Sequence, residues 1–471
     1  MFYSEDYGEH LWDRLIRKND QIFLTLGGHH HGAGYHVSTN DAGNQVINIL
    51  QDYQMAYLGG NGLGGLIQFD LSGNTLDMTA FSPWVQSKDR SQLTQFDELL
   101  PDGASDSYSI PLNFDERFAG FNEEWQPGEE DDPDYTAVLR DTVSEGYTPH
   151  QITEADRPRS TEDYAHVEGT AVHWRPGMAE FNGKRFGEGE AVPAGSVVPD
   201  VVKPQNMTRV PLKPGTTEEM VTYTKDKHPL SADAGSLRFD EPTSDLAVSY
   251  FETAADAAIN SENFENGYTL EAFLKLDENF NGDDNGWSNA LIRNASGTDI
   301  DAALDDGDPA QMLGASNLRE LRWYALGENG EGFSNWTHEV PKGRWMHVAV
   351  VNDPADKSVT MYVDGAPMMR DGYGPVGMAG EAFSWLLGTS AWEGIKQDGW
   401  YGSIGEVRMV DHPIGPDQWL TARAATAPET GSSAEKVALW AVVGGLIAII
   451  AVCLGGAFAP LAEQIREMLR R

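Results

Sequence analysis

The sequence predicts a mainly β protein, in which an antiparallel β-sandwich follows a partial α/β portion and precedes one C-terminal transmembrane helix. Three observations lead to this prediction. From Tyr164 onward, short runs of alternating apolar and polar residues are separated by Gly, Asn, Asp and Pro, without helices between them. Before that, a helix-like segment is followed by a buried strand-like run and by further strand-like runs. Near the end, a long apolar run carries no charge.

These changes along the chain of 471 residues suggest six segments, and the length allows two or three domains. We predict a partial α/β domain at 1–115, an acidic linker at 116–165, the sandwich at 166–425, a second linker at 426–436, the transmembrane helix at 437–458 and a tail at 459–471.

The overall charge is strongly negative, with 33 Lys and Arg against 73 Asp and Glu, a formal net charge of −40. Such a surface repels nucleic acid and anionic lipid headgroups, so we expect no nucleic-acid binding. The single cysteine, Cys453, excludes disulfides within the chain.

The first 115 residues read as one end of an α/β layered domain. Residues 9–19 (EHLWDRLIRKN) have helical spacing, and residues 22–26 (IFLTL) form a short apolar run typical of a buried strand. Further strand-like runs lie at 44–53, 62–71 and 75–84. The acidic, proline-containing stretch that follows predicts a linker with one short helix.

Within the predicted sandwich, apolar residues recur at every second position. The clearest examples are Tyr268, Leu270, Ala272 and Leu274, and then Val359, Met361 and Val363. The pair Asp364 and Gly365 comes directly after the second run and predicts the tight turn of a hairpin.

Three segments of this region resemble laminin-G-like domains of the concanavalin-A-like jelly-roll fold. They are GRWMHVAVVNDPADKSVTMYVDGAPM (343–368), YTLEAFLKLD (268–277) and YGSIGEVRMVDHPI (401–414). The resemblance covers roughly residues 166–425 and implies two curved antiparallel sheets. It also implies a glycan, a protein or calcium as ligand, although some members of the family only pack against a neighbouring domain.

Two tryptophans in the loop-rich stretch SAWEGIKQDGWYG, Trp392 and Trp400, are candidates for stacking on a sugar ring. Trp345, His347 and Tyr362 are expected to be core and sheet residues instead. The acidic loops DENFNGDDNG (277–286) and DIDAALDDGD (299–308) could hold calcium through oxygen ligands. They lack the ordered ligand spacing of an EF-hand, and solvated acidic loops are the alternative.

A second candidate site is the histidine run in QIFLTLGGHHHGAGYH. In an extended segment His29 and His31 point to the same side, where two imidazoles could bind iron, zinc or manganese. A loop cluster with no metal is the alternative.

The histidine run and its flanks resemble the C-terminal part of calcineurin-like metallophosphoesterases over residues 1–115. Their Gly-His-x-His motif maps onto Gly28, His29, His30 and His31, so His29 and His31 take the metal-ligand positions. The resemblance implies two divalent metals (Fe, Mn or Zn) and a phosphoester substrate. The upstream Asp-x-His, Gly-Asp and Gly-Asn-His motifs are absent before His29, so we assign no catalytic residue and expect the isolated chain to be inactive. We expect the chain to be the C-terminal part of a longer protein.

The apolar run at 437–458 is 22 residues long, and a basic tail with Arg466, Arg470 and Arg471 follows it. The positive-inside rule predicts a single-pass protein of the cell membrane, with its body extracellular and its tail cytoplasmic. No export signal is visible at the start.

Two functions remain open: a membrane-anchored extracellular phosphoesterase with a laminin-G-like binding module, or a non-catalytic cell-surface protein that binds a glycan or a protein.

Overall fold

The computed structural model describes residues 7–30, 32–54, 56, 58–94, 97–122, 124–125, 133–240, 247–296, 307–327, 332–371, 376–379 and 382–424. The predicted transmembrane segment, 437–458, and its two flanking segments lie outside these residues, as does His31. Among the residues that are described, no helix is long and apolar enough to cross a membrane. The chain divides into a unit of residues 1–423 and a unit of residues 424–471, and only the first is described below.

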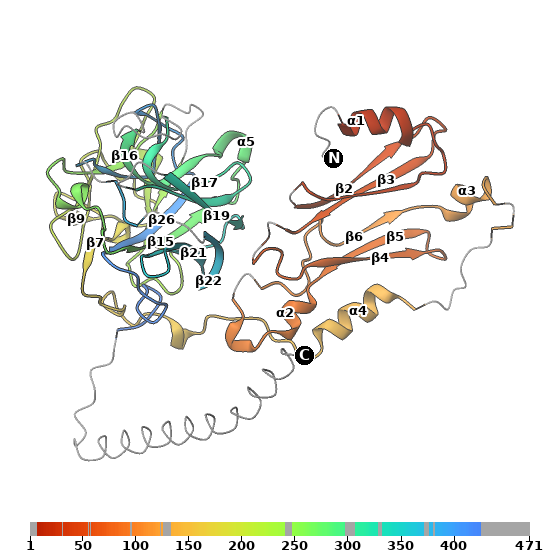
Figure 1. The fold of residues 1–471 in the computed structure, drawn as a ribbon, viewed down its shortest axis with the longest axis horizontal. Helices are drawn as coiled ribbons and strands as arrows, with labels where there is room; N and C mark the ends of the chain where they lie inside the picture. Colours follow the sequence, from red (N-terminus) through yellow and green to blue (C-terminus); the bar gives the residue numbers. More distant parts are fainter. Residues whose placement is uncertain are drawn as a thin grey trace, which may run out of the picture. The chain divides into compact units, whose positions relative to one another are not determined.

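The N-terminal portion contains two small sheets and several short helices (Figure 1). Its elements are α1 (Tyr7–Leu11), the π-helix η1 (Trp12–Ile16), β1 (Leu24–Gly27), β2 (Gly32–Thr39), β3 (Gln45–Asp52), β4 (Gly64–Asp70), β5 (Thr75–Phe81), α2 (Pro83–Ser87), the 3-10 helix η2 (Arg90–Gln92), β6 (Tyr108–Pro111), α3 (Phe114–Ala119) and α4 (Tyr135–Ser144). In the first sheet β3 lies between β1, which is parallel to it, and β2, which is antiparallel. The second sheet is antiparallel, with the order β4-β5-β6.

The two small sheets share one apolar core. Ile47 and Ile49 of β3 pack with Leu76 and Met78 of β5 in a single buried cluster. The predicted strands at 22–26, 44–53, 62–71 and 75–84 are confirmed as β1, β3, β4 and β5. The sequence pattern does not predict β2, because its glycines and its half-buried or exposed side chains give no apolar alternation.

Helix α4 lies inside the segment predicted to be a linker. Its Val143 is buried in a cluster with Val85, Leu93 and Leu99 from the N-terminal portion. The one short helix expected in this segment is therefore present and packs against the N-terminal portion, while the bounds of the linker, 116–165, stay a prediction. The apolar residues of α4 that make this contact are Val143 and the partly buried Leu139, in a segment that is otherwise acidic and polar.

The large β-sandwich follows. Its elements, with the short 3-10 helix before it, are η3 (Glu154–Asp156), β7 (Thr170–Trp174), η4 (Pro176–Met178), β8 (Glu180–Phe181), β9 (Lys184–Arg185), β10 (Val197–Val198), β11 (Met207–Arg209), η5 (Glu218–Met220), β12 (Val221–Thr224), β13 (Ser236–Phe239), β14 (Phe251–Thr253), η6 (Ala258–Ser261), β15 (Tyr268–Leu276), α5 (Gly282–Asn285), β16 (Ser288–Ser296), β17 (Pro309–Ala315), β18 (Glu320–Leu326), β19 (Gly332–Glu339), β20 (Met346–Asp353), β21 (Ser358–Val363), β22 (Ala366–Asp371), β23 (Trp385–Leu387), β24 (Ser390–Trp392), β25 (Ile395–Gln397) and β26 (Gly402–Val410). One sheet has ten strands in the order β19-β18-β17-β16-β23-β14-β11-β10-β8-β9. The other has eight, in the order β12-β13-β26-β15-β20-β21-β22, with β7 also paired to β26. The predicted antiparallel, jelly-roll-like sandwich is confirmed.

The main core lies between these two sheets. Leu270 and Val348 of the eight-stranded sheet belong to one buried cluster with Leu291, Leu313 and Trp323 of the ten-stranded sheet. All seven alternating residues of β15 and β21 that the sequence singled out are in this cluster. The turn between β21 and β22 is the one expected, since Asp364 and Gly365 have φ values of 47° and 84°.

The outer face of the eight-stranded sheet carries charged side chains that are nevertheless buried. Glu271 of β15 accepts hydrogen bonds from Arg408 Nε at 2.8 Å and from the backbone N–H of Leu420 at 2.6 Å. Its Oε1 also lies 3.0 Å from His347 Nε2, and Arg408 Nη1 donates to the carbonyl of Ala165 at 2.7 Å. These bonds attach the segments before β7 and after β26 to the sheet.

A second carboxylate, Glu406 of β26, is buried in the same way. Its Oε1 accepts hydrogen bonds from Ser231 Oγ at 2.6 Å and from the backbone N–H of Asp233 at 3.0 Å. Its Oε2 lies 2.9 Å from His173 Nε2 and 3.4 Å from Arg175 Nε. Buried charges need such partners, so this network explains how loops that contain few apolar residues cover the sheet.

Candidate binding pocket

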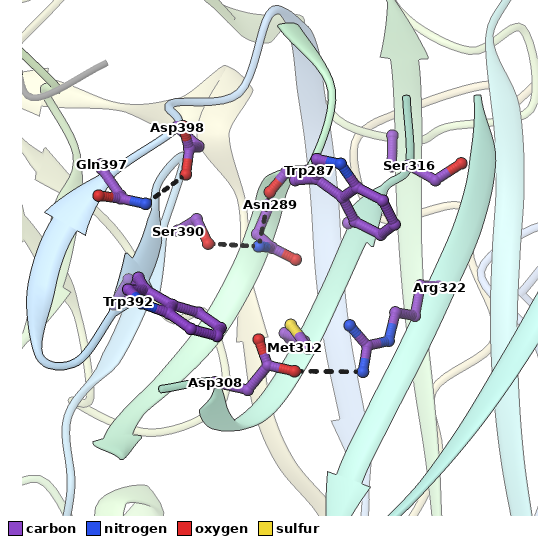
Figure 2. A pocket seen from close by; sticks show the side chains of 13 residues that line it. Trp287, Asn289, Asp308, Met312, Ser316, Arg322, Ser390, Trp392, Gln397 and Asp398 are labelled. Atoms are coloured by element: carbon purple, nitrogen blue, oxygen red, sulfur yellow. Dashed lines mark hydrogen bonds and ion pairs between the residues drawn. The ribbon is translucent and has the colours of Figure 1, made fainter. Parts of the chain in front are cut away.

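A pocket of about 420 Å³ opens on the outer face of the ten-stranded sheet (Figure 2). Leu291 and Leu313 point into the main core, whereas Ile292 and Met312, next to them in sequence, belong to a separate cluster on the other face. Met312 lines the pocket, which places the pocket on the face turned away from the main core. The residues that line it are Trp287, Asn289, Asp308, Met312, Gly314, Ala315, Ser316, Arg322, Ser390, Ala391, Trp392, Gln397 and Asp398.

One wall is the β24–β25 hairpin, which carries Trp392. Its turn residues Glu393 and Gly394 both have positive φ, 47° and 77°, as a two-residue hairpin turn requires. The backbone N–H of Glu393 donates to the carbonyl of Gly307 at 2.9 Å. A Cβ on Gly307 would lie only 2.6 Å from the indole ring of Trp392, so the ring rests directly on this glycine. Trp392 is 41% exposed, which leaves part of its side chain open to a ligand.

A second tryptophan, Trp287, lies across the pocket from the hairpin (Figure 2). It is 52% exposed, and its φ of 64° lies in the left-handed region, which is uncommon for a bulky residue. Its ring packs edge-on against Trp336, with 6.2 Å between the ring centroids. Such outliers concentrate at functional sites, because the surrounding structure has to hold them in place.

Arg322 and Asp308 form an ion pair at the edge of the pocket. Arg322 Nη2 lies 3.2 Å from Asp308 Oδ2, and Arg322 Nε donates to Ser334 Oγ at 3.2 Å. The guanidinium also lies 5.2 Å from the ring centroids of both Tyr324 and Trp336. These contacts hold the cation in one position.

Between the two tryptophans, Asn289 lies over the floor of the pocket. Its Nδ2 donates to Ser390 Oγ at 2.7 Å and to the carbonyl of Trp287 at 3.3 Å. A Cβ on Gly314 would lie 2.0 Å from Asn289 Oδ1, so only glycine leaves room for this amide. On the hairpin side, Gln397 Nε2 donates to Asp398 Oδ2 at 2.8 Å. The pocket therefore combines two indoles, an apolar floor and several polar atoms, which is the usual composition of a small-molecule site.

Of the two tryptophans that the sequence suggested, the structure brings only Trp392 to this pocket. Trp400 is 1% exposed and belongs to the main core, so the prediction that it stacks on a sugar is wrong. Both residues occur in the same glycine-rich stretch, and only the hairpin geometry turns one outward and the other inward. Trp345 and His347 are buried, as expected, and Tyr362 is half-buried.

The predicted metal ligands are described only in part. His29 follows β1, is exposed and has a φ of 70°, and its ring centroid lies 5.9 Å from that of His30. His31 is outside the described residues. Over the described part of the chain, no three His, Cys, Asp or Glu side chains gather closely enough to hold a metal ion. The binuclear site therefore stays a prediction.

The calcium loops also stay a prediction. Most of 299–308 lies outside the described residues. In 277–286 the carboxylate of Asp277 lies 2.6 Å from Arg238 Nη1 and accepts a hydrogen bond from the backbone N–H of Asn279.

The sequence did not predict Trp287 or Arg322 as site residues, and it offered Asp308 only as part of the candidate calcium loop 299–308. The signal for Trp287 is an aromatic residue in a Gly/Asn/Asp loop, NGDDNGW, which resembles the signal used for Trp392. Arg322 alternates with the core residues Leu321 and Trp323, which places it on the outer face of its strand. Its pairing with Asp308 depends on how β17 and β18 align.

Residues 251–418 match a laminin-G-type family model, described as the concanavalin A-like lectin/glucanases superfamily. The match runs from β14 to the segment after β26 and includes every residue that lines the pocket. These residues form a concanavalin-A-like jelly roll, in agreement with the resemblance found in the sequence.

A curated relative, the uncharacterized protein YvnB of Bacillus subtilis (strain 168), is 26% identical over 116 residues, which are 23% of this chain and 8% of that protein. The matched segment is thus a small part of that relative's length.

Similar solved structures have low sequence identity to this chain. One is domain 4 of AbnA, a GH43 extracellular arabinanase from Geobacillus stearothermophilus, in complex with arabinotriose; it is 14% identical, with a TM-score of 0.33, and the likeness covers 55% of this chain and 98% of that one. Another is the Ruminococcus gnavus IT-sialidase CBM40 bound to alpha2,3 sialyllactose, 12% identical with a TM-score of 0.29, covering 39% and 94%. A third is the binding domain of botulinum neurotoxin serotype G, 8% identical with a TM-score of 0.34, covering 52% and 48%.

Proposed function

We propose that the sandwich binds a glycan and that the pocket between Trp287 and Trp392 is the binding site. The observation that carries this proposal is the pair of half-exposed indoles beside polar side chains and above an apolar floor. An indole stacks on the apolar face of a sugar ring, and carboxylate and amide groups pair with its hydroxyls. The matching superfamily model, whose description names lectins and glucanases, supports the same ligand class.

A protein ligand was the other possibility for a laminin-G-like module. The pocket favours the glycan, because a concave site of about 420 Å³ has the size of a small-ligand pocket. A protein partner usually needs a broader surface, roughly 800 Å² on each side. The residues that line this pocket are therefore sufficient to form the proposed glycan site.

Phosphoester hydrolysis rests on the sequence resemblance alone. The described residues contain one of the two predicted ligands, His29. This one exposed histidine after β1 does not by itself form a metal site. The anchor at 437–458 is likewise a prediction. If it spans the cell membrane with the body outside, the pocket faces surface polymers, and membrane attachment raises their effective concentration.

The test is to screen the purified full chain, kept in mild detergent, on an array of plant, microbial and animal oligosaccharides. We expect binding to a limited set of glycans. For the strongest of these, Trp392→Ala should weaken affinity about fivefold or more, since a lost aromatic contact is worth about 1 kcal/mol or more.

The matched control is Trp84→Ala, which removes a tryptophan that is 57% exposed and does not line the pocket. It should bind like the unaltered chain. Absence of binding to every glycan, or an equal loss in both variants, would contradict the proposal.

A further inference from the structure

The pocket carries a net negative charge. Among the described residues that line it, the charged side chains are Asp308, Asp398 and Arg322, two carboxylates against one guanidinium. Asp308 and Arg322 neutralise each other as an ion pair at 3.2 Å. Asp398, whose Oδ2 accepts a hydrogen bond from Gln397 Nε2, is the second carboxylate of this lining.

The single cation of this lining is already engaged by the protein. Arg322 binds Asp308 and Ser334, and its guanidinium lies 5.2 Å from the ring centroids of both Tyr324 and Trp336. Recognition of a carboxylate works best when a guanidinium presents two parallel N–H groups to it. In this pocket Arg322 Nη2 already lies 3.2 Å from Asp308 Oδ2, and Arg322 Nε donates to Ser334 Oγ.

Several of the remaining polar atoms of the pocket are acceptors, beside the indole N–H groups of Trp287 and Trp392, which donate. Asn289 uses its Nδ2 on Ser390 and on the carbonyl of Trp287, and its Oδ1 lies over Gly314. The Nε2 of Gln397 donates a hydrogen bond to Asp398, and the Oε1 of the same amide is an acceptor. Two carboxylates and two amide oxygens suit a ligand that offers many O–H donors.

We infer that the pocket selects an uncharged glycan with several unsubstituted hydroxyls, and that it rejects sugars that carry a carboxylate, sulfate or phosphate at the bound ring. This inference rests on the proposed function of the pocket. Sugar hydroxyls donate to the acceptor oxygens of the wall, while the sugar ring stacks on Trp392. An anionic group only accepts hydrogen bonds, and it enters beside the carboxylates of Asp398 and Asp308, where Arg322, the guanidinium of the described lining, is already paired with Asp308.

The experiment compares pairs of ligands that differ only in charge. Gluco-, galacto-, xylo- and arabino-oligosaccharides are tested for binding to the full chain in EDTA. Each hexose chain is paired with the same chain oxidised at C6 of its terminal sugar to a uronate. We expect the neutral member to bind at least about tenfold more tightly at low salt, and the ratio to shrink at high salt, where charges are screened.

The charge is then changed in the pocket. Asp308→Asn releases Arg322 from its carboxylate, and Asp398→Asn removes the other negative charge. Both should raise the ratio of uronate to neutral binding, by about tenfold (about 1.4 kcal/mol) for Asp308→Asn, because a guanidinium–carboxylate pair is among the stronger hydrogen-bonded pairs. Asp417→Asn is the control: it makes the same change in net charge at an exposed position that does not line the pocket, and should leave the ratio unaltered.

The outcomes separate the two proposals. Equal or tighter binding of the uronate member by the unaltered chain overturns the inference about charge, while glycan binding itself stands. A ratio that shifts as much in Asp417→Asn as in Asp308→Asn also overturns it, since the pocket charges would then not be the cause. Failure of all neutral and acidic glycans to bind overturns the proposed function and the inference with it.

Discussion

At the scale of single residues, the tryptophans of the sandwich divide into two groups by exposure. Trp287 and Trp392 stand half-exposed at the pocket, whereas Trp323 and Trp400 are buried in the core between the sheets. A core tryptophan contributes to stability through burial, while one at a pocket contributes to binding through its open face. The two roles can be measured separately.

Trp400→Ala should lower the free energy of unfolding by about 3–5 kcal/mol, because a large cavity replaces a fully buried indole. Trp392→Ala should lower it much less. Chemical denaturation of the full chain, followed by circular dichroism, gives both values. If Trp392→Ala destabilises the protein as much as Trp400→Ala does, Trp392 is a structural residue and its effect on glycan binding would be indirect.

At the scale of elements, the β24–β25 hairpin positions Trp392 because its indole rests on the backbone of Gly307. Gly307→Ala places a Cβ about where the ring now lies and should push the indole out of position. We expect glycan affinity to fall several-fold, as a misplaced stacking surface loses contact with the sugar. Calorimetric titration with the strongest array ligand measures this loss.

The control for this substitution is Gly120→Ala at the end of α3, where an added Cβ meets nothing within 4 Å. It should leave glycan affinity unchanged. Unchanged affinity in Gly307→Ala as well would show that the position of the Trp392 ring does not govern binding.

The buried carboxylates of β15 and β26 make the fold sensitive to acid. Burial alone would raise the pKa of Glu271 and of Glu406. For Glu271, the charge of Arg408 and the hydrogen bond with His347 outweigh the effect of burial and lower the pKa. For Glu406, the hydrogen bond with His173 helps lower the pKa to about 2. Both groups thus bind protons more weakly in the folded state than in the unfolded state. Their contribution to stability is present above the unfolded pKa of 4.5 and is lost as the pH falls below it.

Three neighbouring groups also contribute to this profile. Burial lowers the pKa of His173 and His228 below 6.5, so they too remove stability as the pH falls through that range. Asp233 acts in the opposite direction. Burial and then the charge of Glu406 raise its pKa to about 7, so its contribution is present below 3.8 and is lost as the pH rises through about 7.

Below about pH 4 the Asp233 effect is complete, so the glutamates dominate there. We expect the urea midpoint of the full chain to fall steadily from about pH 4 to about pH 2.5. Glu406→Gln should start from a lower midpoint and show a shallower fall over this window. A slope identical to that of the unaltered chain would mean that Glu406 is not among the groups responsible.

At the scale of the whole molecule, local patterns predicted the sheets well, while contacts between distant segments escaped them. Alternation at Tyr268, Leu270, Ala272 and Leu274 depends only on which side of one strand is buried. By the same alternation, the intervening Glu271 should face solvent. It is buried, because the backbone N–H of Leu420, far along the chain, closes over it.

The candidate site was predicted only in part for the same reason. Trp392 could be suggested because a tryptophan in a glycine-rich loop is unusual, but that signal did not separate it from Trp400. Arg322 lies opposite Gly314 in the register of β17 and β18, so its pairing with Asp308, which comes directly before β17, depends on the path of the chain into β17. No short motif in the sequence encodes it.

We propose that the sandwich holds a sugar ring against Trp392. The decisive measurement is a crystal structure of the full chain with the strongest neutral ligand from the array. We expect electron density for a sugar ring stacked on the indole face turned away from Gly307, with hydroxyls directed at Asp308 and Asn289. A sugar bound elsewhere on the protein, with this pocket empty, would contradict it.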